Sequence, residues 1–437
     1  MYEDINYLVF QLNLIDKTLP INIISNSNIF NILIQIIEKS MNFNINLIYY
    51  CFKCINKIVE KSEHNTTNYF LKEEFFDIYN NFVSNYINNS IIINLFLDFL
   101  ILCNNNSVIY QTLLISKKYN SIFQKILSIK SYDNSYFLFK FLSSFKLIQY
   151  NEVNINFQKL LFYKCEEYLN YIELDNNLNK ENEEKTINFL LTLKNISLTS
   201  ESSIISLFLN LDRNLNMFIE SLINIKEFNN NNLIINILIL IIGNLLADED
   251  SNNINKFIDI GLLDYLQNKL NDSNINNDLK LRIIWALSNI VVDKQYFDYL
   301  KGKNIFLNLI DFYKNLNNPS IEIVKEIINF FNCCFQYYDF IQILTFLDYN
   351  IIKFYINFLN EWKEPEIILL CLYGFHELFQ KGNLYNTNLN YDINPFLLNF
   401  NNYGGKDLLN NILFKSKNSR IISSCENILN NFFNSKE

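Results

Sequence analysis

The sequence has few of the residues that break or bend a chain. Its 437 residues include seven glycines and four prolines, and every glycine lies at or after Gly243. Alanine is nearly absent, with Ala247 and Ala286 as exceptions. The apolar spacing typical of helices nevertheless continues through the glycine-free first half. We therefore expect asparagine to end helices there, because asparagine tolerates the left-handed backbone conformation.

Long apolar runs and an excess of basic charge are also missing. The longest apolar stretch, Leu233–Ala247, is interrupted by Asn236 and Asn244 and falls short of the roughly 18 residues that a membrane span needs. Met1 to Asp4 lack the basic start of a signal peptide. The net charge of −9 argues against a nucleic-acid binder. We expect neither direct nucleic-acid binding nor membrane insertion.

Groups for catalysis or metal binding are scarce. The sequence has two histidines and shows no phosphate-binding loop or catalytic triad. Cys51 and Cys54 form a CxxC, but no second CxxC or histidine pair follows at zinc spacing, so we expect both thiols to pack in the core. We expect no enzyme activity, no cofactor and no metal. Reduced thiols favour the cytosol or nucleus.

A recurring helical pattern fills the sequence instead. A glycine or asparagine precedes an amphipathic run at several points, and Gly261, Asn304, Asn350 and Gly405 mark the clearest ones. Gly261 and Asn304 are 43 residues apart, and Asn304 and Asn350 are 46 apart. Armadillo and HEAT repeats have periods of about 40–47 residues.

Each unit has a short helix, a Gly or Asn corner, a second helix, a polar break and a long third helix. Leu279–Val292 and Ile321–Phe335 are two predicted third helices. One unit cannot bury its apolar face alone, but stacked units can. The predicted fold is an all-α, armadillo-repeat, right-handed superhelical solenoid of about ten three-helix repeats. Residues 1–437 form one solenoid, with weaker repeats one to five in 1–230 and clearer repeats six to ten in 231–437.

The ends of the third helices carry similar residues. Ile242-Gly243-Asn244-Leu245 ends one, and Asn332-Cys333-Cys334 ends another. Between them, the run from Trp285 to Ile290 resembles the signature of importin alpha, the nuclear import adaptor, in which Asn follows Trp by four residues. Leu372–Phe379 and Tyr403–Leu408 are similar to the last two repeats of that family.

The resemblance implies that the third helices line a concave groove that binds basic nuclear localisation signal peptides. In this family, Trp rings hold Lys and Arg stems, and Asn amides clamp the peptide backbone. Leu191, Leu240 and Ile328 would replace the family's Trp, and Asp248, Glu249 and Asp250 could add negative charge. The residues assigned to peptide binding are Trp285, Asn289, Asn244, Asn332, Asn56, Asn195 and Phe52.

The resemblance also bears on partners. The family begins with a basic arm that binds importin beta, whereas the first forty residues here contain only Lys17 and Lys39 as basic residues. The missing arm argues against importin beta as a partner. The C-terminal repeats would contact an export receptor, and we expect the protein in the cytoplasm and nucleus. The eroded Trp positions favour a second hypothesis, an armadillo-repeat scaffold that has lost cargo-signal binding.

Overall fold

The computed structural model describes a chain of helices joined by turns. The described residues are 29–40, 45–61, 73–106, 180–197, 231–247, 261–389 and 394–433, with single residues or short stretches between 122 and 164 and between 254 and 259. All regular elements in these ranges are helical. None of the described helices has the length and hydropathy needed to cross a bilayer. The prediction of an all-α fold is confirmed.

The chain divides into two compact units, Met1–Ile241 and Ile242–Glu437. In the N-terminal unit, α3 packs on α4, and α4 packs on α6. The helices described there are α3 (Ile29–Ser40), α4 (Ile45–Lys61), α5 (Glu73–Tyr86), α6 (Ser90–Asn106) and α11 (Lys180–Ser197). The division between the units falls within α14 (Asn232–Leu246).

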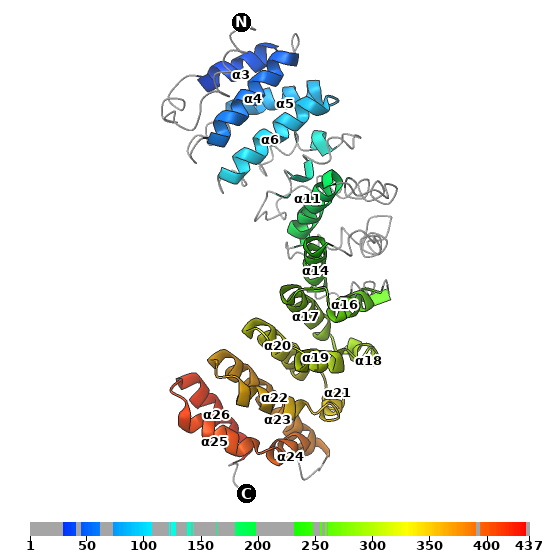
Figure 1. Cartoon of the computed structure of the whole chain (residues 1–437), viewed down its shortest axis with the longest axis vertical. Coiled ribbons are helices and arrows are strands. Elements are labelled where there is room, and N and C mark those ends of the chain that lie inside the picture. Colours follow the sequence, from blue (N-terminus) through cyan, green and yellow to red (C-terminus); the bar gives the residue numbers. More distant parts are fainter. Residues whose placement is uncertain are drawn as a thin grey trace. The chain divides into compact units, whose positions relative to one another are not determined.

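The C-terminal unit is a series of helical repeats, each with a long last helix (Figure 1). The first described repeat contains α16 (Leu262–Asn271) and α17 (Asn277–Val291). The next contains η5 (Lys294–Tyr296), α18 (Phe297–Gly302), α19 (Ile305–Lys314) and α20 (Ile321–Tyr337). Then follow α21 (Phe340–Leu344), η6 (Thr345–Leu347), α22 (Ile351–Glu361) and α23 (Pro365–Leu389), and finally α24 (Pro395–Asn402), α25 (Gly405–Lys415) and α26 (Ser419–Phe432).

The corner before each second helix has a left-handed residue. Gly261 has φ 82°, and Asn304 and Asn350 have φ 56° and 57°. These three corners were predicted from the sequence and are confirmed. The last corner is Gly404, with φ 71°, and not Gly405, which starts α25. Asparagine thus takes the place of glycine at two corners, as its tolerance of this conformation allows.

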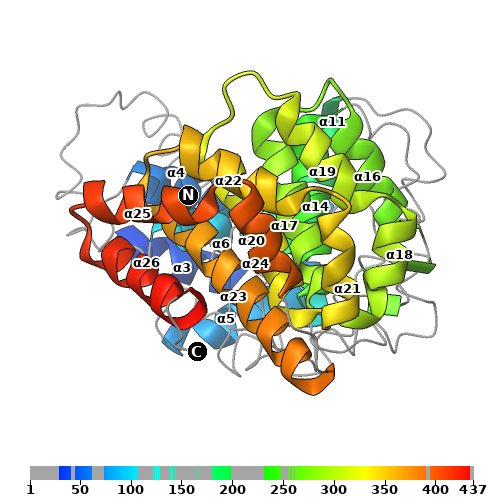
Figure 2. The same cartoon turned by 90° about the horizontal axis from the view of Figure 1, so that it is seen from below.

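The long third helices α17, α20, α23 and α26 contact one another in that order (Figure 1, Figure 2). Three of them begin at a capping side chain: Asn276, Ser320 and Asn418 accept hydrogen bonds from backbone N–H groups of the first turn. Such caps fix where a helix begins. They therefore also fix which later residues in the helix face outward.

Candidate functional site

The third helices of the C-terminal unit leave a narrow row of side chains partly exposed. In α17 this row contains Trp285 and Asn289, nine and thirteen residues after the N-cap Asn276. The other third helices repeat the pattern of buried and exposed positions at the same distance from their first residue. The resulting face pairs are Trp285/Asn289 in α17, Asn329/Cys333 in α20, Tyr373/Glu377 in α23 and Asn427/Asn431 in α26.

Asn244 has the same position in α14. It lies thirteen residues after Asn231, whose side chain accepts hydrogen bonds from the first turn of the helix. Asn244 is half-buried, and so is Leu240, nine residues after the cap. The predicted positions of Leu240, Asn244, Trp285 and Asn289 therefore agree with this register. The acidic residues Asp248, Glu249 and Asp250 lie outside the described residues.

Asn332 does not belong to this row, which corrects the prediction. Its side chain is 5% exposed. Its Nδ2 donates to Leu370 O over 3.0 Å, and its Oδ1 accepts from Tyr355 Oη over 3.0 Å. Third helices α17 and α20 begin 44 residues apart, so the partner of Asn289 is Cys333 and not Asn332. Ile328, expected at the Trp position, is likewise buried, and Asn329 occupies that place.

Phe52 is a core residue, which is a second correction. It is fully buried and packs against the rings of Phe82 and Phe96, with centroids 4.7 and 5.8 Å away. The half-exposed residues of α4 at the equivalent positions are Lys53 and Lys57. In the helix of the third repeat, α6, Phe96 and Leu100 are also buried. The face positions of α6 hold the half-exposed Asp98 and Leu102.

Two kinds of asparagine tie neighbouring helices together. Asn195 and Asn289 are half-buried, and their Nδ2 atoms donate backward along the chain, to Ser143 O over 3.2 Å and to Gly243 O over 2.8 Å. Asn56 lies one position earlier in its helix, as Asn332 does. Asn56 Nδ2 donates forward, to Leu95 O of α6 over 3.1 Å. The asparagines thus have a structural role that the sequence reasoning did not assign.

Trp285 packs directly on the backbone of the preceding third helix. A Cβ at Gly243 would overlap the six-membered ring of Trp285. Asn289 donates to the carbonyl of the same glycine. Trp285 remains half-exposed, so part of its indole is accessible. Gly243 therefore positions both members of the α17 pair.

Glu326 is a carboxylate on α20 that the sequence reasoning missed. It is half-buried, and burial raises its pKa. The same carboxylate contributes to the raised pKa of Cys333, second to burial, which shows that the two groups are close. Among the described residues, Glu326 forms no hydrogen bond or ion pair. Counting from the cap Ser320 could have revealed it, since Glu326 lies one turn before Asn329.

Close contacts join adjacent third helices. Trp285 of α17 lies on Gly243 of α14, and Gly374 of α23 lies against Asn332 of α20. Trp285 and Glu326 belong to α17 and α20, two third helices that pack on each other. An accessible indole and a carboxylate without an ion partner among the described residues therefore lie on adjacent helices.

The CxxC cysteines are buried, as predicted. Cys51 and Cys54 are 0% and 1% exposed. Burial raises the pKa of Cys51 to about 12 and that of Cys54 to about 11. Thiols with raised pKa values are poor nucleophiles at neutral pH. These two cysteines therefore act as small apolar core residues.

No protein-family description and no curated protein matches the sequence. An engineered protein has a similar structure, with a TM-score of 0.70 at 12% identity, covering 97% of this chain and 94% of that one. A designed armadillo repeat protein in complex with the peptide (KR)4 has a TM-score of 0.47 at 16% identity, covering 60% of this chain and 97% of its own. The likeness to the engineered protein establishes the fold alone, an all-helical repeat solenoid.

Proposed function

We propose that this chain binds an extended basic peptide on the third-helix face of its C-terminal unit, as an importin-alpha-like adaptor for nuclear localisation signals. One observation carries the proposal: the half-exposed ring of Trp285 and the half-buried carboxylate of Glu326 lie on the adjacent third helices α17 and α20, and Glu326 has no ion partner among the described residues. An aromatic face attracts the stem and charge of Lys or Arg by about 0.5–2 kcal/mol. The carboxylate then receives the cationic head.

The energetics of Glu326 support a cationic ligand. A half-buried carboxylate loses hydration, which raises its pKa. A Lys or Arg side chain placed beside it supplies the missing counter-charge and lowers that pKa again. Glu326 therefore costs stability in the free protein and contributes affinity in the complex.

Asn289 can hold the peptide backbone. Its described hydrogen bond uses one amide hydrogen, donated to Gly243 O over 2.8 Å. A carboxamide has a second N–H and an acceptor oxygen. The bond to Gly243 fixes the orientation of the side chain, so these groups are already ordered before a peptide arrives. Preorganisation of this kind lowers the entropic cost of binding.

The same proposal covers the cellular partners. An importin-alpha-like adaptor would carry cargo proteins between cytoplasm and nucleus, and its C-terminal repeats would contact an export receptor. It needs no cofactor and catalyses no reaction.

A scaffold that has lost signal binding is the second candidate function. The observation in its favour comes from the N-terminal unit, where Lys53 and Lys57 hold the face positions of α4. Two ammonium groups there repel a basic peptide. The two candidates differ in whether the C-terminal unit binds such a peptide at all.

A fluorescence anisotropy titration distinguishes them. A short lysine- and arginine-rich peptide should bind the full chain at physiological salt, and an acidic peptide of equal length should not. Trp285→Ala, Asn289→Ala and Glu326→Gln should each weaken binding about three- to thirtyfold. Absence of binding to the unmodified chain at physiological salt would support the scaffold instead.

A further inference from the structure

The corner between α25 and α26, the last two helices described (Figure 1), carries an almost fully exposed aromatic ring. Phe414, in the last turn of α25, is 90% exposed, and the next most exposed large apolar side chain among the described residues, Ile91, is 61% exposed. Asn410 and Asn411, on the same side of α25, are exposed and polar. The ring of Phe414 therefore projects alone, and its burial contributes nothing to the fold.

Three cations accompany Phe414 at this corner. Lys415, Lys417 and Arg420 are all exposed. None of them forms an ion pair with a described residue. From Leu408 to Cys425, the sequence has no aspartate or glutamate. In a chain with a net charge of −9, the corner is therefore a local basic patch with an aromatic ring at its edge.

Short-range hydrogen bonds hold the backbone of the corner. Ser416 N donates to Ile412 O over 2.9 Å, where α25 ends. Ser416 Oγ accepts from Asn418 N over 3.2 Å, and Asn418 Oδ1 accepts from Arg420 N over 3.0 Å. These bonds fix the turn from one helix into the next. The aromatic ring and the three cations therefore project from one ordered segment.

The equivalent corners of the preceding described repeats have a different charge. The corner between α16 and α17 contains Asp272 and no cation, and Asn315–Ser320, between α19 and α20, has no charged residue. The corner between α22 and α23 has Lys363 between the carboxylates of Glu361 and Glu364. The basic patch is thus not a general feature of these repeats, and it needs an explanation of its own.

We propose that the α25–α26 corner binds a membrane surface that contains anionic lipids. An aromatic ring can enter the boundary between headgroups and acyl chains, and the flanking cations then lie among the anionic headgroups. A bilayer needs no shaped pocket, which suits a ring that projects alone. A protein interface would have further apolar residues around Phe414, and a nucleic acid would need a longer basic stripe. The contact is peripheral, by one side chain, and differs from the membrane insertion that the sequence argues against.

The expected binding is weak and reversible. Each cation near an anionic surface contributes about fivefold, and partial burial of the ring contributes about tenfold. The product is an association constant of about 10³ M⁻¹, below the ~10⁴ M⁻¹ of a single myristoyl chain. Asp407 and Glu426, the nearest carboxylates in the sequence, lie about 9–10 Å along their helices from Phe414 and Arg420. At physiological ionic strength that distance screens most of their repulsion.

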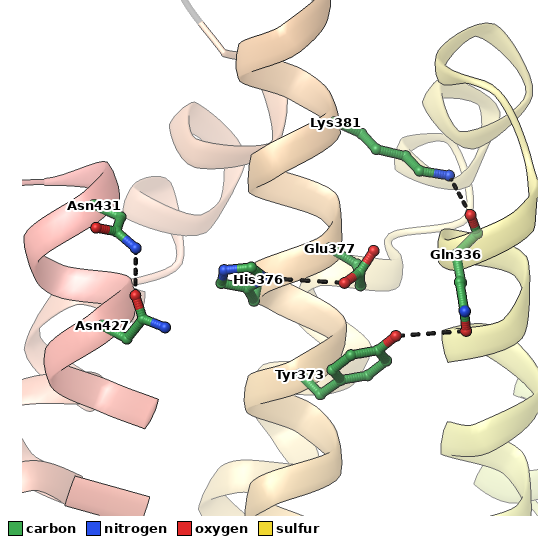
Figure 3. Close-up of polar contacts among 7 residues, drawn as sticks. All are labelled: Gln336, Tyr373, His376, Glu377, Lys381, Asn427 and Asn431. Atoms are coloured by element: carbon green, nitrogen blue, oxygen red, sulfur yellow. Dashed lines mark hydrogen bonds and ion pairs between the residues drawn. The ribbon is translucent and has the colours of Figure 1, made fainter. Parts of the chain in front are cut away.

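The proposed peptide-binding face lies further along α26 than this corner. Its residues in α26 are Asn427 and Asn431, whose side chains hydrogen-bond to each other on successive turns (Figure 3). Arg420 is seven residues before Asn427, about 10 Å along the helix axis. Substitutions at the corner should therefore leave the binding of a basic peptide unchanged, so the membrane contact and the proposed function are tested independently.

Flotation of the full chain with lipid vesicles tests the inference. At about 1–5 mM lipid, the protein should float with vesicles of phosphatidylcholine that contain about a third phosphatidylserine, and it should not float with phosphatidylcholine alone. Phe414→Ala should weaken binding about tenfold, and Phe414→Leu, which keeps an apolar side chain, about twofold. The triple variant Lys415→Ala/Lys417→Ala/Arg420→Ala should weaken binding about a hundredfold.

A second triple variant controls for net charge. Lys301→Ala/Lys314→Ala/Lys363→Ala removes three exposed cations, each within three residues of an aspartate or glutamate. This variant should bind the mixed vesicles within about threefold of the unmodified protein, because its changes lie outside the patch. Circular dichroism shows whether each variant keeps its helices. Release of the unmodified protein from the vesicles by about 0.5 M salt tests the charge dependence without any substitution.

Three results would overturn the proposal. The first is that the unmodified chain does not float with the mixed vesicles. The second is an equal loss of binding in the two triple variants. The third is an acidic peptide or a single-stranded oligonucleotide that binds in place of the vesicles and depends on Lys415, Lys417 and Arg420, since the patch would then belong to another class of partner. A basic peptide enters none of these measurements, so their failure leaves the proposed function intact.

Discussion

Gly243 has no room for a side chain, because the Trp285 ring lies against it. Gly243→Ala should displace the indole and weaken peptide binding. Overpacking costs about 1–3 kcal/mol, of which better helix propensity returns about 1 kcal/mol. The tryptophan fluorescence spectrum and a thermal melt report the two effects. The destabilisation by Gly243→Ala comes from the clash with the Trp285 ring. The double variant Gly243→Ala/Trp285→Ala should therefore lose less stability than the sum of the losses in the two single variants.

Gly302→Ala is the control for this pair. Gly302 lies at the end of α18, and an added Cβ meets nothing within 4 Å. The substitution should leave both the melting temperature and the emission spectrum of Trp285 nearly unchanged. Equal behaviour of the Gly243 and Gly302 variants would contradict the close packing between α14 and α17.

Substitution by alanine should have opposite effects at Asn332, which is buried, and at Asn289, which is on the exposed row. Asn332→Ala removes a buried amide that bonds to Leu370 O and Tyr355 Oη, so it should destabilise the protein by about 1–3 kcal/mol. It should leave peptide affinity unchanged. Asn289→Ala should weaken binding more than stability. Chemical unfolding and peptide titration of both variants measure the contrast, and a loss of affinity in Asn332→Ala would return that residue to the binding face.

Glu326 predicts a pH dependence of stability. Because burial raises its pKa above the usual value of 4.5, the folded protein binds this proton more tightly than the unfolded chain does. The contribution of Glu326 to the free energy of unfolding is therefore fully present below about pH 4.5. It is lost as the pH rises through the higher pKa of the folded state. Glu326→Gln should therefore raise the melting temperature at pH 7 relative to the unmodified protein, and the advantage should vanish near pH 4. The same variant should bind basic peptides less tightly.

At the scale of the element, local signals determine where helices begin and end. The Gly and Asn corners and the polar breaks predicted α16, α17, α19, α20 and α22 to within a few residues. Each signal acts within one turn of the chain, through a left-handed residue or a capping side chain. These are properties that the sequence itself carries.

The register of the third helices was harder to predict. Matching Asn289 to Asn332 assumes a step of 43 residues, whereas the caps Asn276 and Ser320 are 44 residues apart. One residue of error rotates a position by about 100°, which moves it from the exposed row into the core. Asparagine is so common in this sequence that Asn332 happens to precede Cys333, the true equivalent of Asn289. The N-cap residues therefore indicate the rotational register of a third helix better than its asparagines do.

The corner residues make a testable element-scale claim. Asn304 has φ 56°, and its side chain forms no capping bond, so the residue is tolerated for its backbone conformation alone. Asn304→Ala should destabilise the protein by about 1 kcal/mol, and Asn304→Gly should be neutral or stabilising. Asn315→Ala is the control, because Asn315 has φ −89°. Equal melting temperatures for the Ala and Gly variants at residue 304 would show that the corner is not strained.

At the scale of the molecule, the sequence predicted the fold class better than the binding residues. Repetition of one apolar pattern identifies stacked three-helix units, since an error at one position leaves the pattern intact. A binding face depends on single side chains and on the offset between helices, which no local signal reports. Glu326 therefore became visible only when α17 and α20 were seen together. The number of repeats and the course of the superhelix stay predictions.

The location of the proposed peptide-binding residues in one compact unit gives the last prediction. Trp285, Asn289 and Glu326 all lie within Ile242–Glu437. In repeat proteins each unit contacts only its neighbours, so a run of repeats retains its structure when distant repeats are removed. A fragment of residues 231–437 keeps α14 whole, and with it the Gly243 backbone under Trp285. This fragment should be helical by circular dichroism and should bind the lysine- and arginine-rich peptide within about threefold of the full chain. A helical fragment that does not bind, while the full chain does, would contradict the assignment of the site to the C-terminal unit.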